Sequence, residues 1–112
     1  MKKIIKLKEI SKDEYLLIAK CIKNYINHFS DDNRKDYFEK ILNKLLLTDL
    51  NKNICFIDIS KDEFRDIIII LDLYNVLISI DIDSNNHWGY DIHDAHKKIE
   101  KLFIRKYKES IF

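Results

Sequence analysis

The sequence ICFIDISKDEFRDIIIILDLY, residues Ile54–Tyr74, is the most apolar run of the chain and decides its expected fold. It repeats the opening of the chain, IIKLKEISKDEYLLIAKCIKNY at Ile4–Tyr25, at an offset of 49 positions. In both copies an apolar residue precedes Ser, Glu follows Ser by three residues, and an aromatic residue follows Glu. This pattern combines a capping box with a hydrophobic staple. Helices are therefore predicted to begin at Lys12 and Lys61.

Each predicted helix is preceded by a short segment in which neighbouring residues alternate in character. In the second copy, Ile54, Phe56 and Asp58 lie on one side and the residues between them on the other. Alternation with a period of two, rich in Ile and Phe, indicates a strand. A strand thus runs into a helix twice, over 4–25 and 53–74. The sequence leaves open whether an ancient duplication or two independent helix starts produced this repeat.

Apolar spacing and turn residues predict the remaining helices. The first is expected to run from Lys12 to about residue 28 and the second over about 33–47, capped by Asp32. The third is expected over 61–74, with Asn75 as a left-handed cap, although its β-branched run leaves a strand as the alternative. Asp91 is expected to cap the last helix.

Two more strands are predicted after the third helix. Residues 76–82 alternate between apolar and polar, and 87–90 follow a turn as a short strand or a loop. The resulting order is β-α-α-β-α-β-(β)-α, with a right-handed parallel crossover between the second and third strands. We therefore expect an α+β or small α/β fold, with a three- to four-stranded sheet and helices mainly on one face.

Length and composition predict a single domain over 1–112 in a reducing cytoplasm. The chain has no proline, one glycine and two cysteines, which does not resemble a secreted disulfide scaffold. Charged residues interrupt the first ten positions as no secretory signal would allow, and no apolar run is long enough to span a membrane. Abundant Lys, Ile and Asn indicate a low-GC source, such as a bacterium, its phage or another mobile element.

Charge is distributed unevenly along the chain. Residues 1–55 carry a net charge of +4, residues 56–94 a net charge of −7, and residues 95–112 a net charge of +4. An acidic segment of this kind can pair with neighbouring basic elements or attract a basic partner. Trp and Tyr, which are common at binding hot spots, flank the only glycine at its end.

The leading hypothesis is a non-enzymatic protein that binds and inhibits a macromolecular partner, such as a nuclease or toxin. An immunity protein, an antitoxin, or a phage anti-defence protein of the anti-CRISPR type has this character. No complete catalytic motif and no cofactor motif is present, so neither an enzyme nor a cofactor is predicted. A homodimer is possible. The residues expected to bind the partner protein are Asp81, Asp83, Trp88, Tyr90, Asp91 and Asp94.

Two alternatives use other residues of the same region. Carboxylates and imidazoles between 81 and 96 could form the metal site of a hydrolase, although their spacing matches no standard motif. Its candidate ligands are Asp81, Asp83, His87, His93 and His96. The basic last helix could instead contact nucleic-acid phosphates. Its candidate contacts are Lys97, Lys98, Lys101 and Arg105.

Overall fold

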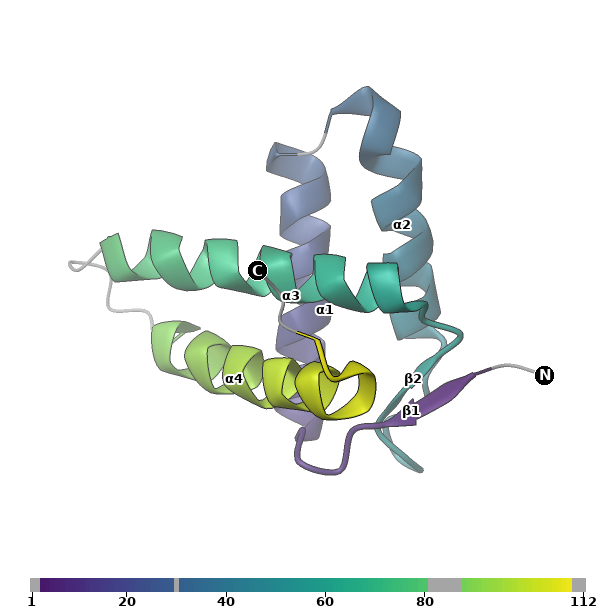
Figure 1. Ribbon diagram of the computed structural model, residues 1–112. Helices are drawn as coiled ribbons and strands as arrows, with labels where there is room; N and C mark the ends of the chain where they lie inside the picture. Colours follow the sequence, from purple (N-terminus) through teal and green to yellow (C-terminus); the bar gives the residue numbers. More distant parts are fainter. Residues whose placement is uncertain (1–2, 30, 81–87, 110–112) are drawn as a thin grey trace.

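Four helices and a two-stranded sheet make up the described part of the computed structural model, which covers residues 3–29, 31–80 and 88–109 (Figure 1). In chain order the elements are β1 (Ile4–Lys6), α1 (Lys12–His28), α2 (Asp32–Leu46), β2 (Cys55–Ile57), α3 (Lys61–Ile80) and α4 (Trp88–Tyr107).

The two helix starts predicted from the repeated sequence are confirmed. At α1, the Ser11 hydroxyl accepts the Glu14 amide at 3.1 Å, and the Glu14 carboxylate accepts the Ser11 amide at 3.0 Å. Ser60 and Glu63 make the same two bonds at α3, at 3.1 and 2.8 Å. The preceding isoleucine and following aromatic residue are buried in both copies. At α2 the cap is Asp31 rather than the predicted Asp32, and it accepts the Arg34 amide.

Helix α3 is longer than predicted, and this removes one expected strand. It continues through Asn75 to Ile80, so residues 76–80 are helical, while 81 and 82 lie outside the described residues. No glycine or proline interrupts the chain between Ser60 and Trp88. Because helix propagation adds a hydrogen bond at each step, a started helix continues until something stops it. Over residues 67–74, burial at helical spacing outweighs the strand preference of the β-branched residues.

The predicted three- to four-stranded sheet is wrong. In the described residues the sheet consists of β1 and β2 alone, paired antiparallel with Ile5 opposite Phe56. No parallel crossover therefore joins β2 to a third strand in that part of the chain. The expected fourth strand is also absent, because Trp88–Tyr107 is helix α4 and Asp91 lies inside it rather than capping it. The described part of the chain is thus mainly helical, and its helices do not cover one face of a broad sheet.

The helices form two antiparallel hairpins that cross each other (Figure 1). Helices α1 and α2 make one hairpin, as predicted, and α3 and α4 make the other, which lies across α1. Every helix contributes fully buried side chains to a shared apolar core, represented by Ile22, Ile41, Ile68 and Phe103. No helix in the described ranges is both long and apolar enough to cross a membrane.

Candidate protein-binding surface on the α3–α4 hairpin

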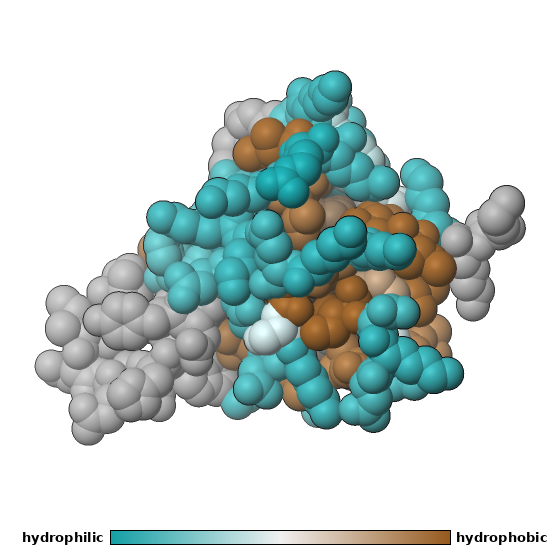
Figure 2. Space-filling view, turned by 90° about the horizontal axis from the view of Figure 1, so that it is seen from below, coloured by the Kyte–Doolittle hydropathy of each residue, from teal (hydrophilic) through white to brown (hydrophobic). Residues whose placement is uncertain are grey.

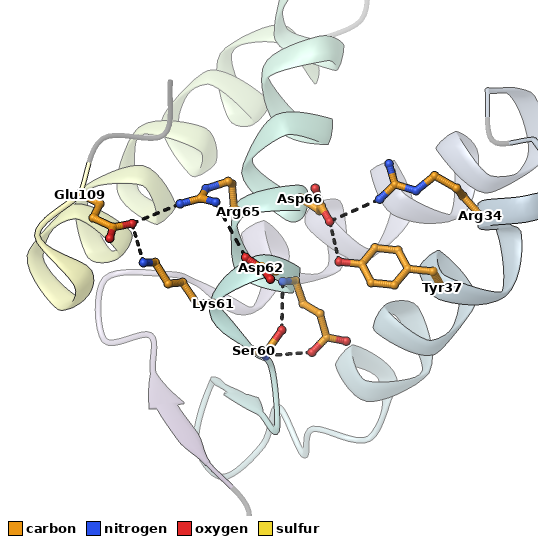
Figure 3. A network of polar contacts seen from close by, with 9 residues as sticks. Arg34, Tyr37, Ser60, Lys61, Asp62, Arg65, Asp66 and Glu109 are labelled. Carbon is orange, nitrogen blue, oxygen red and sulfur yellow. Dashed lines mark hydrogen bonds and ion pairs between the residues drawn. The ribbon is translucent and has the colours of Figure 1, made fainter.

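The first turns of α3 carry a network of polar contacts that holds this helix to its neighbours (Figure 3). The Glu63 carboxylate, which also completes the capping box, accepts hydrogen bonds from the Lys44 ammonium of α2. Its two oxygens lie 3.0 and 2.9 Å from the Lys44 nitrogen. Burial raises the pKa of Glu63, but the Ser60 amide and the Lys44 ammonium outweigh it and lower the pKa below its usual value. Glu63 is therefore ionised and committed to the fold.

Asp66 is committed in the same way one turn later. Its carboxylate accepts the Tyr37 hydroxyl and lies 3.7 Å from the Arg34 guanidinium, both on α2 (Figure 3). Burial, followed by the hydrogen bond to the Asp66 carboxylate, raises the pKa of Tyr37, so this tyrosine stays neutral.

The chain after α4 returns to the start of α3. Glu109 accepts from Lys61 and from Arg65, the latter at 3.2 Å (Figure 3). These contacts, led by the hydrogen bond from Lys61, lower the pKa of the Glu109 carboxyl. The acidic groups at this end of the α3–α4 hairpin thus have cationic partners within the molecule.

The other end of the hairpin differs in charge. Between Asp66 and Lys97 the sequence contains five aspartates and no lysine or arginine. We call the described part of this end, residues 69–77 of α3 and 92–96 of α4, the tip surface. The Asp72 side chain is 41% exposed, and Asp94 is exposed as well. No described lysine or arginine forms an ion pair with either carboxylate.

Apolar side chains accompany these carboxylates on α3. Ile69, Val76 and Leu77 are 41%, 50% and 38% exposed. They lie at spacings of seven and eight residues along the helix, so they project from neighbouring positions on its surface. An apolar centre with a polar rim is the usual arrangement of a protein-binding surface.

The predicted partner-binding residues fall into three groups. Asp94 is exposed on α4, as the hypothesis requires. Trp88, Tyr90 and Asp91 belong to the first turn of α4, so the aromatic residues lie on a helix rather than in a loop or strand. Asp81 and Asp83 lie outside the described residues. The sequence did not single out Asp72, whose contribution appears only when α4 is seen beside α3.

The histidines of α4 do not act together. His93 is exposed and its Nδ1 lies 3.3 Å from the Asn75 amide nitrogen of α3. His96 is buried, with Nε2 at 3.6 Å from Glu100 and 3.9 Å from Asp72. Within the described ranges no three potential ligands are grouped closely enough to hold a metal ion. The other candidate ligands, Asp81, Asp83 and His87, lie outside these ranges.

The basic residues of α4 are also divided between two roles. Lys98 contacts both oxygens of Glu14 on α1 at 3.0 Å, so it joins α4 to the other hairpin. Lys97, Lys101 and Arg105 are exposed at intervals of four residues, and they form a row along the outside of α4.

Neither cysteine has the surroundings of a nucleophile. Cys21 on α1 and Cys55 on β2 are free thiols, and both are buried. Burial raises the pKa of the Cys21 thiol to about 12, so this group is not a thiolate at neutral pH.

No protein-family model, curated protein or solved structure matches the chain.

Proposed function

We propose that the protein binds a basic protein partner through the tip surface and inhibits that partner by occluding it. The observation that supports this proposal best is the run between Asp66 and Lys97, which has five aspartates and no lysine or arginine. The ends of α3 and α4 bring part of this run side by side (Figure 1). At the other end of the hairpin Glu63, Asp66 and Glu109 have cationic partners, whereas Asp72 and Asp94 form no ion pair with a described lysine or arginine.

This arrangement would speed the association of a basic partner and fix its orientation on the surface. Carboxylates gathered at one end of a molecule steer a basic surface toward it, and they suppress binding of acidic competitors. The exposed apolar side chains of α3 would then supply the contact area that excludes water. A nuclease or a similar enzyme, whose basic groups hold nucleic acid, fits this chemistry. We place this binding in the cytoplasm, in keeping with two unpaired cysteines.

The proposal is tested by neutralising the tip surface. The test variant combines Asp72→Asn with Asp94→Asn. The control variant removes the same charge elsewhere through Glu9→Gln and Asp36→Asn, two exposed positions for which the described structure shows no ion pair. Each tagged protein is used to capture partners from lysate of its host. The captured protein is then purified, and its affinity and its enzymatic activity are measured with each variant.

We expect the parent and the control to retain one basic protein and to inhibit it. The tip variant should bind it at least tenfold more weakly, with most of the loss disappearing at high salt, because exposed charge pairs are screened there. Equal affinity of all three proteins for the captured partner would show that the tip surface does not carry the interaction.

A second candidate function is nucleic-acid binding by the exposed row on α4. Lys97, Lys101 and Arg105 support it, since three cations at this spacing can follow a phosphate backbone. Replacing all three by Gln should flatten the salt dependence of affinity for labelled DNA and RNA. Replacing Lys23, Lys35 and Lys40 by Gln provides the matched control on the other hairpin. Weak binding that all variants share equally would count against this function.

A further inference from the structure

The open edge of β1 is the second surface of the molecule that a partner could use. Leu7 donates its amide to the Ile54 carbonyl, and Asp58 donates to the Lys3 carbonyl. In an antiparallel pair, residues that bond to the partner strand alternate with residues whose main chain points away. The main-chain groups of Ile4 and Lys6 therefore point out from the sheet.

The two edges of this small sheet differ. On the β2 side, the Thr48 hydroxyl at the end of α2 donates to the Cys55 carbonyl at 3.0 Å and so covers that edge. In the described structure no comparable contact reaches Ile4 or Lys6, and the Ile4 side chain is 60% exposed. An open edge can pair with an additional extended chain.

A groove begins where this edge ends. It has a volume of about 380 Å³ and lies between the segment after β1 and the segment before β2. Leu7, Leu50 and Ile54 give it an apolar floor. Figure 2 views the molecule from below and shows an apolar area bordered by hydrophilic side chains in its right half, the side on which Figure 1 places the strands.

The groove has a strong charge of one sign. Lys6, Lys8 and Lys52 line it, and its described lining contains no carboxylate. None of these three lysines forms an ion pair with a described residue, whereas Lys44, Lys61 and Lys98 each do. Cations that gather around an apolar floor without internal partners favour an anionic ligand with apolar side chains.

We propose that the β1 edge and this groove bind an acidic peptide segment in extended conformation, as an added strand. The peptide main chain would pair with Ile4 and Lys6, its carboxylates would contact the three lysines, and its apolar residues would lie on the groove floor. This surface is separate from the tip surface, so the inference does not depend on the proposed function.

A second copy of the chain and a nucleic acid fit this site less well than an acidic peptide does. A second copy of the chain would pair β1 with β1 and bring Lys6 and Lys8 close to their equivalents, which like-charge repulsion disfavours. A nucleic acid would meet the lysines, but it has no main chain to pair with the outward amides and carbonyls of β1. An acidic peptide satisfies both features.

The experiment measures the affinity of the whole protein for a labelled short peptide of alternating Glu and Val. A second peptide has the same sequence with N-methylated amides on the pairing side, which keeps the charge and removes strand pairing. A labelled oligothymidylate tests nucleic acid. Two variants change the site: Lys6→Glu with Lys52→Glu reverses charge, and Ile4→Pro removes an outward amide together with the exposed isoleucine side chain, at an edge position that tolerates proline. Lys23→Glu with Lys40→Glu is the charge control.

We expect the alternating peptide to bind, the N-methylated peptide to lose at least tenfold in affinity, and each site variant to lose about tenfold while the control does not. Circular dichroism and thermal unfolding verify that the variants fold. The proposal is overturned if the N-methylated peptide binds as tightly, if oligothymidylate binds better with the same variant dependence, or if the alternating peptide does not bind to the folded parent protein.

Discussion

Single buried polar side chains connect distant parts of this small fold. The Tyr15 hydroxyl of α1 donates to the Leu45 carbonyl at the end of α2, at 2.7 Å, and lies 3.1 Å from the Thr48 hydroxyl. Thr48 in turn donates to Cys55 of β2. The Tyr15 hydroxyl thus adds a donor to the Leu45 carbonyl, at a helix end where carbonyls lack intrahelical partners, beside the longer bond from the Thr48 amide at 3.4 Å. Tyr15 itself is 2% exposed, so water does not replace its contacts.

Removing the Tyr15 hydroxyl should therefore destabilise the protein. We expect Tyr15→Phe to lower the free energy of unfolding by about 1 to 2 kcal/mol, because a buried hydrogen bond to the Leu45 carbonyl is lost. Urea unfolding measures the change. Tyr25→Phe is the matched control, since the Tyr25 ring is packed against Phe29 and Phe38 but no described group bonds to its hydroxyl. An equal loss in both variants would contradict the assignment to the hydrogen bond.

The carboxylate of Glu63 should make stability depend on pH. Its pKa is lower in the folded protein than its ordinary value. The resulting stabilisation is fully present above the unfolded pKa and is lost as pH falls through the folded pKa. Glu63→Gln keeps a side chain that can complete the capping box but removes the charge opposite Lys44.

We expect Glu63→Gln to lower the free energy of unfolding by about 1 to 2 kcal/mol at neutral pH. The difference from the parent protein should shrink toward zero as the pH falls below the range in which glutamates titrate. Urea unfolding across a pH series measures this, with the exposed Glu9→Gln as control. A difference that stays constant with pH would mean that the charge of Glu63 is not responsible.

The elements show which sequence signals determine the structure. Helix starts at Lys12 and Lys61 were predictable because capping boxes and staples are local and involve only neighbouring residues. The length of α3 was not predictable, because residues 76–80 alternate like a strand while their conformation follows the helix before them. The apolar–polar alternation of these few residues is a weaker signal than the packing of the preceding part of α3 against α1 and α4.

Substitutions at Asn75 test whether α3 ends at residue 74, as the sequence predicted, or continues to Ile80. If Asn75 were a left-handed cap, glycine there would be more stable than alanine. Inside a helix, glycine should be less stable than alanine by about 1 kcal/mol. Both substitutions lose the contact with His93, so the difference between them reports on the backbone alone. We expect Asn75→Gly to unfold at lower urea concentration than Asn75→Ala; the reverse order would place the helix end at residue 74.

The end of α4 should respond in the opposite way. Lys108 follows the helix with a φ of 54°, a conformation that costs little only for glycine. Its amide bonds to the Ile104 carbonyl at 2.7 Å, as in a helix that ends on a left-handed residue. We expect Lys108→Gly to raise the free energy of unfolding by about 0.5 to 1 kcal/mol. In contrast, Lys101→Gly, on the exposed middle of α4, should lower it by a similar amount in the same urea titration.

For the whole molecule, sequence reasoning located the acidic region but not its three-dimensional composition. The charge of residues 56–94 was visible in the sequence, and Asp94 is exposed as expected. The sequence could not reveal that Glu63 and Asp66 pair with residues of α2. It also could not reveal that Asp72 belongs to the tip surface. The basic groove was missed for the same reason, because its lysines come from segments more than 40 residues apart.

The two cysteines report how cooperatively the whole molecule opens. Cys21 lies in the core between helices, while Cys55 lies on a sheet that has two strands in the described residues, and a sheet of this size has little stability of its own. We expect an uncharged thiol reagent to label Cys21 only through global unfolding, and Cys55 also through a smaller opening of the sheet. In the single variants Cys55→Ser and Cys21→Ser, mass spectrometry measures the labelling rate of the remaining thiol in increasing urea. Because a larger opening exposes more surface, the Cys21 rate should rise more steeply with urea than the Cys55 rate. Equal slopes would show that the sheet and the helices open as one unit, with β1 no more accessible than the core.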